Sequence, residues 1–84
     1  MLSENVTWCR MFFNRLSDGG VWGIPACGVV FTRRGDKLVW TDAMPWMPGM
    51  PITEQELIEE QVDMFRSTRD YFGLAGIEVT DGRP

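Results

Sequence analysis

The apolar residues of this sequence fall into short runs separated by turns, and the first run covers residues 6–16. It contains Trp8, Phe12 and Phe13, whose side chains favour β-structure. Large apolar residues occupy both alternating phases of this run, so either both faces of a strand are covered or the segment is a short helix. We expect a strand here and keep the helix as the alternative.

The next runs predict three short strands. Residues 21–24 form the first of them, and Pro25 ends it because proline has no N–H to donate to a neighbouring strand. Residues 29–32 and 37–41 flank a charged turn in which Gly35 is free to take a positive φ. This arrangement predicts a β-hairpin.

A proline-rich loop and then a helix follow the hairpin. Residues 42–51 contain three prolines, which exclude a helix and a central strand and predict an extended, ordered loop. Thr53 then stands three residues before Glu56, the spacing of a helix N-cap with its capping box. We expect a helix over about residues 54–75 and a last short strand over residues 77–80. The predicted apolar stripe of the helix is Leu57, Ile58, Gln61, Phe65, Thr68 and Phe72.

These elements predict one α+β domain over residues 1–84. We expect a small antiparallel sheet of about four or five strands in the chain order ββββαβ, with one amphipathic helix packed on one face. A chain of 84 residues has room for one core and no second domain. With 44% hydrophobic residues, it has enough apolar side chains to form that core.

The negative charge of the chain is concentrated in the predicted helix. The formal net charge is −4, and residues 53–72 alone carry six acidic and two basic residues. An acidic chain lacks the basic face that binding to a phosphate backbone requires, so we expect no direct contact with nucleic acid.

The absence of histidine removes several kinds of chemistry. It excludes histidine-based acid–base catalysis, histidine metal ligands and Ser-His-Asp or Cys-His nucleophiles. Cys9 and Cys27 are too few for a structural zinc site, and we expect them to be buried thiols. The helix offers carboxylate pairs but no convergent third ligand, so we predict no catalytic residue, no metal and no cofactor.

The acidic residues of the predicted helix gather opposite its apolar stripe; they are Glu56, Glu59, Glu60, Asp63 and Asp70. Such a face keeps a small protein soluble. It is also suited to dock on a basic surface, because complementary charge speeds association and raises specificity. Glu56, Glu59, Glu60 and Asp63 are therefore candidate partner-binding residues.

The proline-rich loop carries four large apolar side chains, those of Met44, Trp46, Met47 and Met50. They either complete the core across an open end of the sheet or form an exposed recognition loop. Tryptophan is a typical interface anchor, methionine adapts to irregular pockets, and proline lowers the entropy lost on binding. Trp46, Met47 and Met50 are therefore also candidate partner-binding residues.

The hairpin turn suggests an alternative function. Arg33 and Arg34 stand at this turn, where charged residues are ordinary, but guanidinium groups also bind phosphate and carboxylate. Together with stacking by Trp22, Trp40 or Trp46, they would bind or sequester a nucleotide signal.

Three segments give the chain a resemblance: Trp22-Gly-Ile-Pro25 followed by Gly28-Val-Val-Phe31, Met44-Pro followed by Met50-Pro-Ile-Thr53, and Tyr71-Phe followed by Ala75-Gly-Ile-Glu-Val79. With them the chain resembles small accessory proteins of bacterial viruses or mobile elements. In size, acidity and lack of catalytic groups it is similar to anti-CRISPR and other anti-defence proteins, which commonly block a host complex by occupying a nucleic-acid or partner surface. The resemblance implies inhibition by binding, and no catalytic or binding residue is carried over with it.

These observations predict a protein that is not an enzyme and that binds and modulates a larger host protein or nucleic-acid-processing complex. Nucleotide binding is the first alternative, and a structural or assembly role in a viral particle is the second. An exposed strand edge can also pair with a second copy of the chain, so a homodimer is compatible with these predictions. The N-terminus has no basic segment before an apolar one and no run reaches the length of a membrane span, so we expect a cytoplasmic protein without membrane contact.

Overall fold

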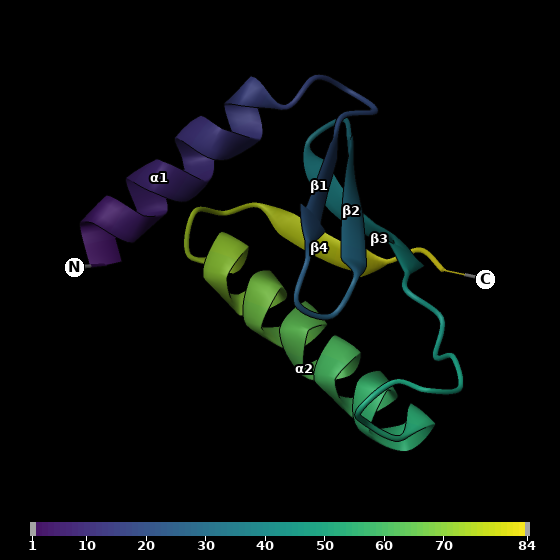
Figure 1. The fold of residues 1–84 in the computed structure, drawn as a ribbon. Helices are drawn as coiled ribbons and strands as arrows, with labels where there is room; N and C mark the ends of the chain where they lie inside the picture. Colours follow the sequence, from purple (N-terminus) through teal and green to yellow (C-terminus); the bar gives the residue numbers. More distant parts are fainter. Residues whose placement is uncertain (1, 84) are drawn as a thin grey trace.

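The computed structural model describes residues 2–83, and Figure 1 shows how their helices and strands are arranged. In chain order the elements are α1 (Leu2–Arg15), β1 (Val21–Ile24), β2 (Val29–Arg34), β3 (Lys37–Ala43), α2 (Glu54–Gly73) and β4 (Glu78–Asp81). Neither of these helices is long and apolar enough to cross a membrane.

The four strands form one sheet in the order β1-β2-β3-β4. Antiparallel hairpins join β1 to β2 and β2 to β3, whereas β4 pairs parallel with β3. Parallel neighbours need a crossover connection, which α2 provides. The predicted α+β class is confirmed, but the sheet is mixed rather than antiparallel, and the chain order is αβββαβ rather than ββββαβ.

The strand predicted over residues 6–16 is wrong, because this segment belongs to α1. In a helix, Cys9, Phe12 and Phe13 lie on one side, since residues three and four apart are neighbours. Cys9 and Phe13 are buried there. The apolar residues in both phases of the run follow helical spacing, and this side of α1 packs on the core. The protein therefore has two helices on its sheet within residues 2–83, where one was expected.

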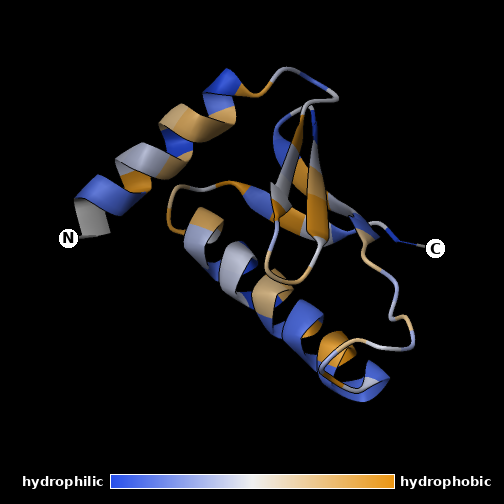
Figure 2. Ribbon diagram, viewed as in Figure 1, coloured by the Kyte–Doolittle hydropathy of each residue, from blue (hydrophilic) through white to orange (hydrophobic). Residues whose placement is uncertain are grey.

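An aromatic layer fills the space between the sheet and the two helices. Trp22, Phe31 and Trp40 are cross-strand neighbours in β1, β2 and β3, so their side chains share one face of the sheet. Phe65 of α2 stacks on Trp40 with the ring centroids 5.1 Å apart, and Phe12 of α1 meets Trp22 at 5.3 Å. Both helices therefore cover the same face, and Figure 2 shows apolar residues alternating with hydrophilic ones along each of them.

α2 begins as the sequence predicts. The Thr53 hydroxyl accepts a hydrogen bond from the backbone N–H of Glu56 at 3.1 Å, and the Glu56 carboxylate accepts one from the N–H of Thr53 at 2.9 Å. The helix ends at Gly73 rather than at residue 75. Its buried residues are Leu57, Gln61, Thr68 and Phe72. All four belong to the predicted stripe, but Ile58 of that stripe is 47% exposed.

The capping box predicts a pH dependence of stability. The hydrogen bond from the Thr53 backbone N–H, together with the Thr53 side chain, lowers the pKa of Glu56 below its usual value. A carboxyl group with a lowered folded-state pKa stabilises the fold fully above its unfolded-state pKa, and this contribution is lost as the pH falls through the folded-state pKa. We expect the unfolding free energy of Glu56→Gln to lie below that of the native chain at neutral pH and to approach it in acid, as measured by urea denaturation. Glu59→Gln is the control, and an equal pH-dependent difference for both variants would contradict the role of the capping box.

Candidate functional site

The proline-rich loop between β3 and α2 is folded against itself. The indole N–H of Trp46 donates to the carbonyl of Ile52 at 2.8 Å, and the backbone N–H of Met47 donates to the sulfur of Met50 at 3.1 Å. Trp46 and Met50 are half-buried, whereas Met47 is 60% exposed. Of the three candidate residues in this loop, Met47 offers the largest free apolar surface.

The four candidate acidic residues of α2 are exposed to solvent, but two of them already have partners. Glu56 is held in the capping box, and the Glu59 carboxylate accepts a hydrogen bond from Gln55 at 3.1 Å. Glu60 and Asp63 are exposed and form no ion pair with any residue in the described part of the chain. These two carboxylates are therefore available to a partner.

Arg33 links the hairpin to α1. One of its terminal nitrogens donates to the carbonyls of Phe13 and Leu16 at 2.8 and 2.6 Å, and its Nε donates to the carbonyl of Gly35 at 2.9 Å. The guanidinium carbon also lies 4.2 Å from the centre of the Phe13 ring. Because the carbonyls at a helix C-terminus favour a positive charge, Arg33 acts as a cap for α1.

The other residues of the nucleotide-binding alternative do not converge on one site. Trp40 is 1% exposed, and its indole N–H donates to the carbonyl of Asp42 at 2.9 Å. Trp22 faces the helices, on the sheet face that it shares with Arg33. Arg34 follows Arg33 in β2, so its side chain lies on the opposite face. Arg34 therefore lies apart from Trp22 and Arg33, and Trp40 is not accessible to a ligand.

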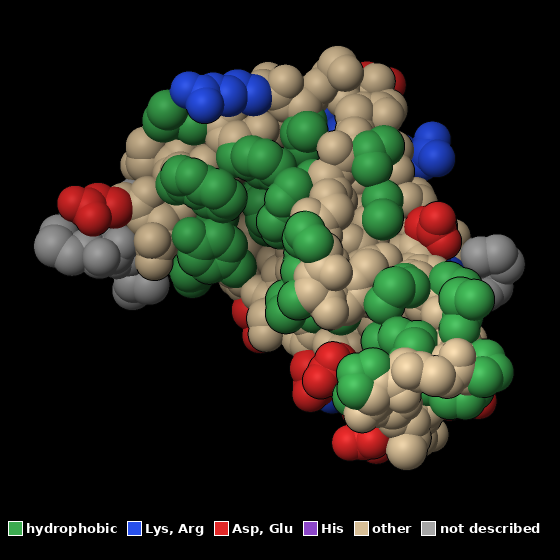
Figure 3. Space-filling model, viewed as in Figure 1, with side chains coloured by type: hydrophobic (Ala, Val, Ile, Leu, Met, Phe, Trp, Pro, Cys, Tyr) green, Lys and Arg blue, Asp and Glu red, His purple; other side chains and the backbone are tan. Residues whose placement is uncertain are grey.

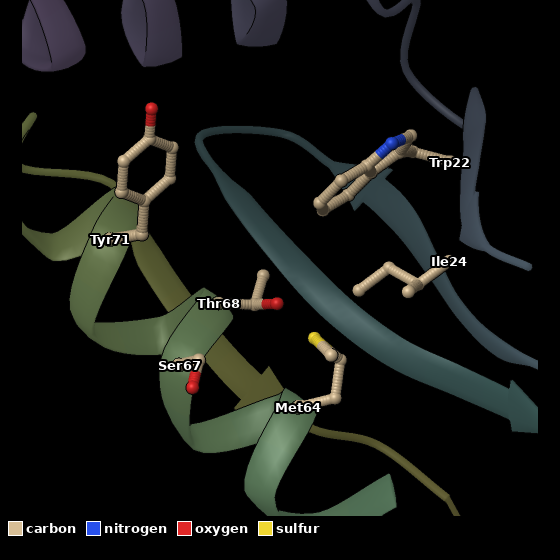
Figure 4. Close-up of a pocket in the computed structure, with 6 residues that line it drawn as sticks. All are labelled: Trp22, Ile24, Met64, Ser67, Thr68 and Tyr71. Atoms are coloured by element: carbon tan, nitrogen blue, oxygen red, sulfur yellow. The ribbon is translucent and has the colours of Figure 1, made fainter. Parts of the chain in front are cut away.

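A groove lies between β1 and α2, and Figure 4 shows the side chains on its two walls. Its volume is about 380 Å³, and it is lined by Trp22, Ile24, Met64, Ser67, Thr68 and Tyr71. α1 closes one end, where Trp8 lies 6.0 Å from the ring of Tyr71 and stacks on Phe12 at 5.3 Å. We call this hollow the β1–α2 groove.

A second hollow of about 350 Å³ continues the β1–α2 groove along the helix, since Met64 and Ser67 line both. Its other lining residues are Ala26, Cys27, Glu60 and Asp63. The free carboxylates of α2 therefore stand at one end of an apolar groove, and the aromatic residues of α1 stand at the other.

Gln61 fixes the acidic end of the groove. Its buried side-chain amide donates to the carbonyls of Cys27 and Met44 at 3.0 and 2.9 Å, so it ties two loops to α2. Glycine is required where these loops meet, because Gly28 has a φ of 69° and a Cβ there would lie 2.3 Å from the Cβ of Met44. The position of the β1–β2 turn beside Glu60 follows from these contacts.

The sequence contained only indirect signs of the groove. Met64 and Tyr71 stand at the margin of the helical stripe, two turns apart, with Ser67 between them. Such a margin indicates a half-buried side of the helix. It does not indicate which strand that side faces, and Trp22 was expected to serve a different site.

The described residues show no metal centre and no disulfide. No three His, Cys, Asp or Glu side chains within residues 2–83 are placed to hold a metal ion. Cys9 and Cys27 are free thiols, and both are buried as expected. Burial raises the pKa of the Cys9 thiol, so this side chain acts as a neutral core residue.

Comparison of the chain with protein-family models, curated proteins and solved structures finds no match. No relative or structural neighbour therefore supplies a role for any residue. The β1–α2 groove, with two carboxylates at its end that form no ion pair with the described residues, combines an apolar hollow with free negative charge.

Replacing Arg33 by alanine tests the link between the hairpin and α1. The change removes charge-assisted hydrogen bonds to two helix carbonyls, so we expect the unfolding free energy to fall by about 1.5–3 kcal/mol in urea denaturation. Arg34→Ala is the matched control, because Arg34 is exposed, and its effect should stay within about 0.5 kcal/mol. Equal losses for the two variants would contradict the assigned role of Arg33.

Replacing Gln61 by methionine tests the contact that positions the acidic end of the groove. Methionine keeps the length of the side chain but leaves the carbonyls of Cys27 and Met44 without their donor, a loss of about 1–3 kcal/mol. We also expect faster hydrogen exchange at the backbone amides of residues 26–28, measured by NMR. Gln55→Met, on the exposed side of the same helix, should leave that exchange unchanged. Unaltered exchange in Gln61→Met would contradict the role of Gln61 in positioning the β1–β2 turn.

Proposed function

We propose that this chain is a non-enzymatic binding protein that inhibits or modulates a larger host protein or a nucleic-acid-processing complex. It docks on a basic protein surface through the exposed side of α2. The observation that carries the proposal is the position of Glu60 and Asp63, without a cationic partner in the described residues, at the end of the β1–α2 groove. A role of the anti-defence type in a bacterial virus is consistent with the acidity and small size of the chain.

Charge favours this docking mode. Glu60 and Asp63 are three residues apart on one helix, so their carboxylates are neighbours that repel each other weakly. A lysine or arginine from a partner would relieve this repulsion. The net charge of −4 would also attract a basic surface from a distance and raise the rate of association.

Apolar surface on both sides of the carboxylates supplies the other part of an interface. The β1–α2 groove lies on one side, and a hollow on the other flank of α2 is lined in part by Ile58 and Val62. Figure 3 shows hydrophobic side chains gathered over α1 and β1 and again near the start of α2, with acidic side chains between the two groups. Stable interfaces usually combine such apolar patches with a charged rim.

The nucleotide-binding alternative has weaker support. Arg33 already donates to α1, and Trp40 is too deeply buried to stack on a ligand.

The test begins with affinity capture of a partner from the host, followed by reconstitution of the complex from two purified proteins. We expect Glu60→Lys combined with Asp63→Lys to weaken the reconstituted complex at least about tenfold and to flatten its salt dependence, because the attraction between opposite charges is lost. Titration calorimetry at several salt concentrations measures both effects.

The control combines Asp36→Lys with Glu78→Lys, which changes the net charge by the same amount away from α2. Near-ultraviolet circular dichroism of each variant checks its fold. Equal weakening by both pairs of substitutions would show a general charge effect and contradict docking through α2. Failure to reconstitute a complex with any captured protein would also contradict the proposal.

A further inference from the structure

β1 is an edge strand with one unpaired side. It pairs with β2, and no other strand in the described chain lies beside it. Its sequence, Val21-Trp-Gly-Ile24, contains no charge and no proline, the residues that commonly protect an edge from pairing. Val21 is 61% exposed and Gly23 is also exposed. This edge is therefore open to an additional strand.

The register of the hairpin defines which backbone groups of β1 are free. The N–H of Arg33 donates to the carbonyl of Gly20 at 2.8 Å, which marks these two residues as a hydrogen-bonded pair at the start of the ladder. Hydrogen-bonded pairs recur at every second residue of an antiparallel ladder. Trp22 therefore directs its backbone groups toward β2, whereas Val21 and Gly23 direct theirs away from it.

The same edge borders the β1–α2 groove. Trp22 and Ile24 alternate with Val21 and Gly23 along the strand, and their side chains form one wall of the groove, as Figure 4 shows. An added strand beside β1 would place every second side chain on that face of the sheet, opposite Met64 of α2. The free backbone groups and the apolar groove are therefore placed to bind the same segment.

Charge distinguishes the two ends of this site. Beyond Ile24 the groove continues to Glu60 and Asp63, which face the turn at Ala26 and Cys27. The opposite end is closed by the aromatic side chains of α1. A basic side chain on the added segment would therefore find its partners near residues 25–28.

We infer that β1 accepts an extended segment of the partner protein as an additional strand, with an apolar side chain in the β1–α2 groove and a lysine or arginine against Glu60 and Asp63. The backbone of the segment hydrogen-bonds with Val21 and Gly23, which gives affinity for many sequences. The groove and the carboxylates select the side chains. This inference rests on the proposed function and names the chemistry of the partner segment.

The other edge of the sheet and a second copy of the chain fit this role less well. β4 carries Glu78 and Asp81, and charges on an edge strand oppose pairing. A second copy pairing through its own β1 would bring an uncharged strand and no cation for Glu60 and Asp63.

The test uses a blocked nonapeptide of alternating valine and threonine with lysine at one end, made in two versions with lysine at either terminus. We expect one version to shift the amide signals of Val21 and Gly23 in NMR titration and to slow the exchange of both amides. An N-methyl group on every second residue, on the edge facing β1, removes the new hydrogen bonds and should weaken binding at least about tenfold. Glutamate in place of lysine should weaken it at least about fivefold.

Two matched variants of the protein test the groove itself. Ser67→Arg places a large side chain where the two hollows meet, and we expect it to abolish peptide binding. Asn14→Arg adds the same charge on α1, at a position that lines neither hollow, and should leave peptide binding within about twofold of the native value. Both positions are exposed, so neither change disturbs the core.

Strand addition is overturned if neither peptide binds at about 1 mM, where even weak peptide complexes form, or if the N-methylated peptide binds as well as its parent. Signals of β1 that shift with the concentration of the chain alone would assign the edge to a second copy and also overturn strand addition.

The proposed function and strand addition can fail separately. A reconstituted complex that survives Ser67→Arg but not the charge reversal on α2 retains the proposed function and overturns strand addition. If Ser67→Arg abolishes the complex and the charge reversal has no effect, strand addition at β1 is supported and docking through the charges of α2 is overturned.

Discussion

The stacking of Phe31 between Trp22 and Phe65 is the contact on which the fold depends. Phe31 is completely buried, and its ring lies 5.6 Å from that of Trp22 and 6.5 Å from that of Phe65. This face of the sheet carries the large apolar side chains, so both helices have to pack on it. The opposite face carries residues such as Thr32 and Thr41, whose hydroxyl oxygens are 2.8 Å apart. These two hydroxyl groups hydrogen-bond to each other, and neither helix of the described residues packs on this face.

Covering one sheet face with two helices leaves a space at the side of β1. α1 reaches this face at Trp22, and α2 contacts β2 and β4. The β1–α2 groove is the part of the aromatic face that neither helix fills. Gln61 keeps its acidic end in shape, because one buried amide holds the β1–β2 turn and the start of the proline-rich loop. Packing of the core and exposure of the groove therefore have the same cause.

The parts of the fold that depend on neighbours in the sequence were predictable. Thr53 and Glu56 predict the start of α2, and Gly35 predicts the hairpin, because capping and turn geometry involve only a few residues. The first helix was mistaken for a strand because bulky aromatic side chains suit both structures, and burial of Cys9 and Phe13 decided between them. Glu60 and Asp63 were recognised as candidates, but their place beside the β1–β2 turn depends on a tertiary contact. The cap made by Arg33 could not be foreseen, since it joins residues that are distant in the sequence.

The parallel pairing of β4 with β3 sets an order for folding. The hairpins of β1, β2 and β3 connect residues close in the chain, whereas Lys37 meets Glu78 only after α2 has crossed the sheet. Contacts between distant residues cost more chain entropy and generally form late. One wall of the groove therefore belongs to the local part of the fold, whereas the other is held in place by contacts between residues that are distant in the chain. A substitution in β4, far from the groove, would weaken the packing that holds α2 and would change the shape of the groove, although it would alter none of the residues that line it.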